Sequence, residues 1–113
     1  GKDLSFLDLA GLDFKRADLG GANLYGSDLS RTRLAGSNLA GARLDRANLA
    51  QSDFSGANLR NATLLTVSAH ATVEPNPKDA PLFIGADLSG AVIAARLDGA
   101  DFSRANLSKA SIG

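Results

Sequence analysis

The chain has 113 residues, which is enough for one small domain. Its twelve Lys and Arg residues balance its twelve Asp and Glu residues, and this zero net charge argues against a nucleic-acid binder, which would carry a basic excess. The absence of cysteine excludes disulfide frameworks, thiolate metal sites and cysteine nucleophiles. No apolar run approaches the ~20 residues of a membrane helix, so no membrane contact is predicted.

Residues 2–66 follow a period of five. A large apolar residue recurs at every fifth position from Leu4 to Leu64, with a mostly small residue two positions earlier. Asp or Asn often stands one position before it, and Gly often stands two positions after it. A step of five scatters side chains around a helix and alternates them between the faces of a strand, so the apolar residues share one interior only if the chain turns after every pentad. Four such turns predict a square coil, and successive coils stack through backbone pairing at about 4.8 Å.

The first coil departs from this pattern, because Leu7 and Leu12 stand where small residues are expected. Together with Phe6, they predict a capping coil at the N-terminal end. The unpaired edge of an end coil can stack with another chain. A homodimer through an end coil is therefore a further expectation.

One outward column is predicted to hold Asp13, Arg33 and Asp53, since outward positions stack every twenty residues. Lys15 and Arg16 add positive charge beside it. Exposed ion pairs contribute only about 0–1 kcal/mol each, so the column is either a solvated ladder or a docking surface of mixed charge. For the second case, Lys15, Arg16 and Arg33 are the candidate partner-binding residues.

Residues 67–80, VSAHATVEPNPKDA, interrupt the repeat. They contain two prolines, which oppose a long helix. They also hold the chain's only histidine, His70, and its only glutamate, Glu74. A loop of this kind can carry function, or it can be a neutral surface insertion. If it carries function, His70 and Glu74 are the candidate partner-binding residues.

The repeat resumes at residues 81–113. Phe83 takes the inward position, and Leu88 and Ile93 follow it at the same period of five residues. From Leu97 onward the apolar residues come one position early, which predicts a shortened repeat at residues 91–94. Residues 1–113 are therefore expected to form a single domain of about five coils, with repeats at 2–66 and 81–113 and one inserted loop at 67–80.

No catalytic site is predicted. Catalysis needs a base, an acid or nucleophile, and a pocket, whereas the predicted interior is filled by Leu, Phe and Ala. The stacked residues Asp8, Asp28 and Asn48 lack the spacing of a loop that binds hard metal ions. We therefore expect no enzyme activity, no metal and no cofactor.

Motifs of one type cover nearly the whole chain, including ADLGG (17–21), ANLYG (22–26), SNLAG (37–41), ADLSG (86–90) and ADFSR (100–104). The chain resembles the pentapeptide repeat family in these motifs. The resemblance implies an all-β fold, a right-handed quadrilateral β-helix. In that fold each coil has four pentads, and the large apolar residue and the small residue two positions before it point inward.

The expected function is a noncatalytic structural scaffold or protein–protein interaction module, which binds an unidentified protein through a coil face or the 67–80 loop. The alternative comes from the resemblance. Some pentapeptide repeat proteins look like B-form DNA in size and charge, and they act on type II topoisomerases. Those members have strongly acidic faces, whereas arginines interrupt the Asp columns here. A soluble, cytoplasmic protein is the default expectation, or an exported one if an upstream leader was removed, and the family's abundance suggests a bacterial host.

Overall fold

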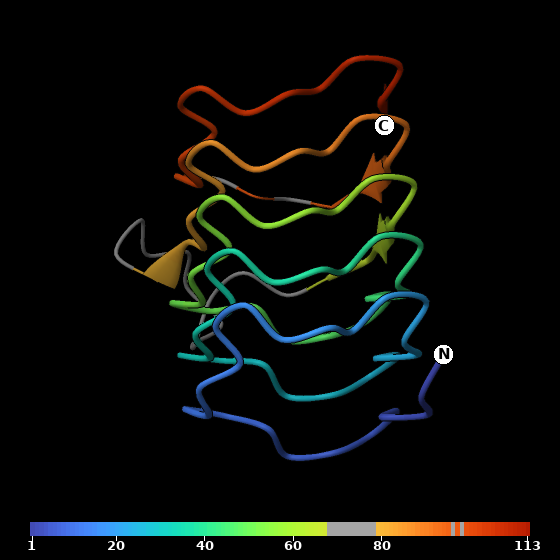
Figure 1. Cartoon of the computed structure of the whole chain (residues 1–113), viewed down its shortest axis with the longest axis vertical. Helices are drawn as coiled ribbons and strands as arrows, with labels where there is room; N and C mark the ends of the chain where they lie inside the picture. The colour runs from blue at the N-terminus through green and yellow to red at the C-terminus, as the bar shows by residue number, and fades with distance from the viewer. Residues whose placement is uncertain (68–78, 96, 98) are drawn as a thin grey trace.

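The computed structural model describes residues 1–67, 79–95, 97 and 99–113. The chain winds as a right-handed quadrilateral β-helix whose coils stack along one axis, with the N-terminus near one end and the C-terminus near the other (Figure 1). One wall carries the short strands β1 (Thr63–Leu65), β2 (Val92–Ala94) and β3 (Ser111–Ile112), which form a parallel sheet in that order. Isolated parallel bridges join the coils elsewhere. The predicted fold class is confirmed.

The bridges follow the predicted spacing. In the first coils each bridge joins residues twenty positions apart, as in the pair Asp18 and Asn38. Near the C-terminal end the spacing shortens to nineteen, as in the pair Asp87 and Asn106. The one-residue shift predicted after Ile93 is therefore confirmed.

The coil that contains residues 67–80 is longer than the others. Asp53 pairs with Leu82, which is 29 positions away instead of twenty, so nine residues are added to this coil. Val67 is buried, and the main-chain N–H of Gln51 donates to the carbonyl oxygen of Asp79 at 2.6 Å. Both ends of segment 67–80 therefore belong to the wall of the coil.

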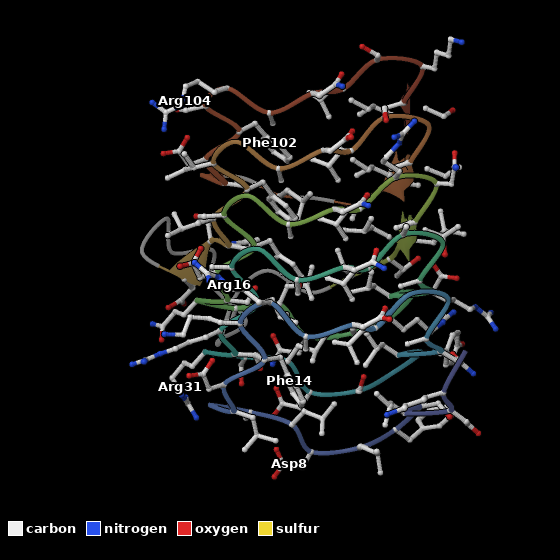
Figure 2. The ribbon with its side chains drawn as sticks, viewed as in Figure 1. Asp8, Phe14, Arg16, Arg31, Phe102 and Arg104 are labelled. Atoms are coloured by element: carbon white, nitrogen blue, oxygen red, sulfur yellow. The ribbon has the colours of Figure 1, made fainter. Side chains whose placement is uncertain are left out.

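Leucine and phenylalanine columns fill the interior. The rings of Phe54 and Phe83 stack with centroids 5.1 Å apart, and those of Phe83 and Phe102 stack at 5.0 Å. This separation is close to the spacing of paired strands, so each of these three coils contributes one ring to the column. Figure 2 shows Phe14 and Phe102 inside the coil, whereas Arg16 and Arg104 project from its edge.

Corners of the coil turn at residues with positive φ. At one of them the Ala42 N–H donates to the carbonyl oxygen of Leu39 at 2.9 Å, and the intervening Gly41 has φ of +69°. A positive φ at the third residue is the signature of a type II turn, which favours glycine. Among the residues that the structure describes, nine glycines and nine others have positive φ. The second group includes Arg16, Arg31 and Arg46, whose backbone conformation costs about 1–2 kcal/mol each.

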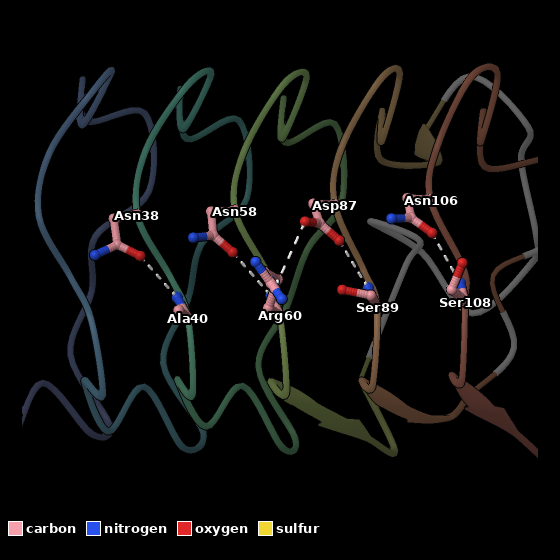
Figure 3. Close-up of polar contacts among 8 residues, drawn as sticks. All are labelled: Asn38, Ala40, Asn58, Arg60, Asp87, Ser89, Asn106 and Ser108. Carbon is pink, nitrogen blue, oxygen red and sulfur yellow. Dashed lines mark hydrogen bonds and ion pairs between the residues drawn. The ribbon is translucent and has the colours of Figure 1, made fainter.

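The Asp and Asn residues that precede the inward positions have a local structural role. The Asn38 side-chain oxygen accepts the N–H of Ala40 at 3.1 Å, and the Asn106 oxygen accepts the N–H of Ser108 at 3.0 Å (Figure 3). Each side chain thus satisfies a backbone donor outside the coil-to-coil ladder. This local hydrogen bond explains why Asp and Asn recur before the inward residue.

The N-terminal end coil differs in detail from the expectation. Leu7 and Leu12 remain 43% and 46% exposed, and Phe6 is 72% exposed. The Phe6 ring lies over Gly26 and meets the Tyr25 ring edge-on, with centroids 5.4 Å apart. Phe6 therefore packs on the outside of the next coil and does not fill the interior. A homodimer through an end coil stays a prediction.

Candidate interaction surfaces

The three basic residues singled out in the sequence lie together on two adjoining coils, and we call Lys15, Arg16 and Arg33 the basic patch. Arg33 bridges to Asp13 on the coil below, and the Lys15 Nζ lies 3.8 Å from Asp13 Oδ2. Arg16 occupies the adjacent corner and packs against Gly36 of the next coil. A Cβ added to Gly36 would lie 3.4 Å from the Arg16 Cγ. The structure thus brings the three cations to one edge of the coil.

The column that contains Arg33 of the basic patch alternates between negative and positive side chains. Asp13 pairs with Arg33 and Arg33 with Asp53, as predicted. Within the described part of the chain, no ion pair joins Arg33 to either carboxylate. The exposed Arg33 guanidinium therefore keeps its donors for other groups.

His70 and Glu74 lie outside the described residues, so their place relative to the basic patch stays a prediction. The end of their segment is held at Asp79, whose Oδ1 accepts a hydrogen bond from the Gln51 side-chain amide at 3.0 Å. Leu82, which follows, pairs with Asp53 in the same column as Arg33. Segment 67–80 therefore returns to the wall that carries the basic patch.

A second surface, which the sequence analysis missed, surrounds Tyr25 on the wall of β1 and β2. The Arg43 guanidinium carbon lies 4.5 Å from the centre of the Tyr25 ring, and its Nε donates to Asp45 Oδ2 at 2.8 Å. Asp45 Oδ1 accepts the N–H of Leu65 at 2.9 Å. Because Thr63 stands where most pentads have Asp or Asn, the Asp45 carboxylate caps this donor from the coil below.

Asp45 is ionised at neutral pH although its carboxylate is largely buried. Burial raises its pKa, but hydrogen bonds from Arg43, from the Leu65 N–H and from Thr63 together hold the pKa below the usual value. The charge is therefore fixed in place by the wall, and Asp45 serves as a structural anchor for Arg43.

A third feature is an open polar depression of about 310 Å³ on the wall drawn in Figure 3. Arg60 and Lys109 bound it, and the small residues Ser89, Gly90 and Ser108 lie between them. The sequence analysis missed this grouping because it spans the irregular spacing on both sides of residue 82. Residues 60, 89 and 108 align when offsets of 29 and nineteen positions between neighbouring coils replace the regular offset of twenty.

The described residues hold no group of three His, Cys, Asp or Glu side chains that could bind a metal ion. In that same part of the chain, no helix has the length and apolar character needed to span a membrane.

The sequence profile of the pentapeptide repeats matches the chain in eight copies, over residues 3–34, 27–64 and 82–112. The chain belongs to the pentapeptide repeat family. No curated protein matches its sequence.

The chain is similar to several solved structures. A protein of the Arabidopsis thaliana thylakoid lumen has a TM-score of 0.70 and 26% identity, and the match covers 95% of this chain and 66% of that one. The chain thus spans slightly less than two thirds of that protein. A Nostoc PCC 7120 protein has 36% identity and a TM-score of 0.42, with 88% and 68% covered. QnrB1, a plasmid-mediated fluoroquinolone resistance protein, has 18% identity and a TM-score of 0.42, with 98% and 77% covered.

Proposed function

We propose that this pentapeptide repeat protein is a noncatalytic scaffold that binds a protein partner on the outside of its coil. The observation that carries the proposal is the filled interior, where inward residues such as Leu34, Phe54 and Phe83 are fully buried. Side chains that can meet a partner therefore lie on the outer walls. A backbone ladder holds them at fixed spacing, which lowers the ordering cost of association.

The basic patch and segment 67–80 are the proposed binding elements. Lys15, Arg16 and Arg33 are exposed, and arginine is among the residues enriched where protein interfaces gain most of their affinity. The column that holds Arg33 continues through Asp53 to Leu82, two residues after the end of segment 67–80. In this proposal, His70 and Glu74 contact the same partner as the basic patch.

The alternative of a DNA-mimicking topoisomerase modulator needs a continuous acidic surface. Arg33 lies between Asp13 and Asp53, and Arg43 lies between Asn23 and Thr63. These cations interrupt two columns of the described walls, so the arrangement favours a protein-binding scaffold over DNA mimicry.

Affinity capture from the source lysate, read by mass spectrometry, tests the proposal. The baits are the parent chain, a variant with residues 67–80 replaced by a short Gly-Ser link, and Arg33→Glu. Lys2→Glu is the charge-reversal control, because Lys2 is exposed and lies beside the Asp3–Asn23 bridge, in a different column from the basic patch. We expect a partner that the parent and Lys2→Glu retain and that the other two variants lose. A partner held equally by all four baits, or no enriched partner, would contradict the proposed site.

A further inference from the structure

The depression bounded by Arg60 and Lys109 spans three successive coils. Asn58 pairs with Asp87, and Asp87 pairs with Asn106, so these three residues form one row along the wall (Figure 3). Arg60, Ser89 and Ser108 each follow a member of that row by two positions. They therefore form a second, parallel row that lines the depression.

The residues that line the depression include two cations and no carboxylate. The nearest acid on this wall, Asp87, uses Oδ1 to accept the N–H of Ser89 at 3.0 Å. Its Oδ2 lies 3.8 Å from Arg60 Nε, which is beyond hydrogen-bond distance. The Arg60 side chain is 62% exposed. The Asp87 carboxylate thus attracts the Arg60 guanidinium without a hydrogen bond, and the guanidinium N–H donors remain available to a ligand.

Neutral donors complete the lining. Because Asn106 Oδ1 accepts the Ser108 N–H, the amide NH₂ of Asn106 faces away from that turn and can donate to a ligand. Gly90 has φ of +70°, and the side-chain oxygen of Asn61 occupies the place that a Cβ on residue 90 would take. A side chain at this position would force the Asn61 side chain to move and would hold a strained positive φ, and glycine avoids both.

We propose that this depression binds an oxyanion of the phosphate-monoester class. Neighbouring coils are about 4.8 Å apart, so the main chains of Arg60 and Lys109 lie about 10 Å apart, a span that their long side chains can close around one tetrahedral anion. Arginine contacts such an anion with two parallel N–H donors, and lysine contacts it as a point charge. The volume of about 310 Å³ leaves room for the group that carries the phosphate.

Titration with inorganic phosphate, followed through the backbone amide signals of the ¹⁵N-labelled chain, tests the site. Sodium chloride holds the ionic strength constant, and acetate serves as the monoanionic comparison. We expect saturable shifts centred on Ser89, Gly90, Ser108 and Lys109, with weaker binding of acetate. Arg60→Gln and Lys109→Gln should each weaken phosphate binding about tenfold, because each removes one charge-assisted contact. The double variant should abolish saturable binding.

Arg33→Gln is the matched control, since it removes one exposed cation from a different wall and should leave phosphate binding unchanged. Unshifted signals away from residues 60 and 109 establish that each variant keeps its fold. A phosphoserine peptide and glycerol phosphate, compared in the same titration, distinguish a phosphorylated protein from a phosphorylated metabolite as the source of the group. Shifts spread equally over the arginines of all walls, or binding that survives the double variant, would overturn the proposal. The test is independent of the protein-partner proposal, which does not involve Arg60 or Lys109.

Discussion

Replacing Gly41 by alanine isolates the backbone cost of one corner of the coil. Gly41 has φ of +69°, and an added Cβ would meet no atom within 4 Å, so a steric clash contributes nothing. The left-handed conformation costs an alanine about 1–2 kcal/mol. Alanine also restricts the unfolded chain, which offsets about 0.4–1 kcal/mol of this cost. We therefore expect Gly41→Ala to lower the free energy of unfolding by about 1 kcal/mol.

Urea unfolding followed by far-ultraviolet circular dichroism measures this change, with an unchanged slope against denaturant. Ala40→Gly is the matched control, because Ala40 precedes Gly41 at the same corner without a positive φ. It should destabilise by about 0.5–1 kcal/mol through chain entropy alone. Arg31→Gly, at a corner with φ of +56°, should leave stability unchanged or raise it. A Gly41→Ala variant as stable as the parent would refute the assignment of strain to the corner backbone.

Phe83→Ala should cost about 3–5 kcal/mol in denaturant unfolding, because it empties the middle of the stacked ring column. Phe83→Leu should cost much less, and equal losses for the two variants would contradict the cavity argument. Ser37→Ala should change stability by less than about 0.5 kcal/mol, since the carbonyl oxygen that its hydroxyl bonds also accepts the Ser37 N–H. Folding lowers the pKa of Asp45, so its carboxylate contributes stability above the ordinary carboxyl value of about 3.9, and this stability is lost as the pH falls through the lower folded-state pKa. Asp45→Asn should therefore flatten the acid limb of the pH–stability curve, and an unchanged limb would refute the role of this carboxylate. The scaffold proposal predicts no effect of the chain on DNA supercoiling by gyrase, and inhibition would restore the DNA-mimic alternative.

Local chemistry made the repeat predictable. A large apolar residue every fifth position, with glycine two positions later, leaves one arrangement in which all the apolar side chains share an interior. The structure places Leu24, Leu44 and Leu64 there, fully or nearly fully buried. Stacking by twenty residues also predicts the column of Asp13, Arg33 and Asp53, which the bridges confirm.

Contacts between coils were decided by the tertiary structure. The Asp45 carboxylate caps the N–H of Leu65, twenty residues away, and also accepts a hydrogen bond from the Thr63 side chain, which stands at the usual Asp or Asn position. Pentad spacing carries no sign of such a replacement, since it depends on which side chain of the coil below reaches the unsatisfied donor.

The candidate site residues also divide into those that the repeat spacing places and those that only the contacts between coils place. Regular spacing was enough to place Lys15, Arg16 and Arg33 on one edge, whereas His70 and Glu74 remain predictions. The grouping of Arg60 with Lys109 required the bridge offsets of 29 and nineteen residues on either side of Leu82. By itself, the sequence determined what each pentad does locally, because turn and burial preferences act over five residues. Only the tertiary structure decided which pentads face each other, because that depends on the number of residues that each coil takes to close.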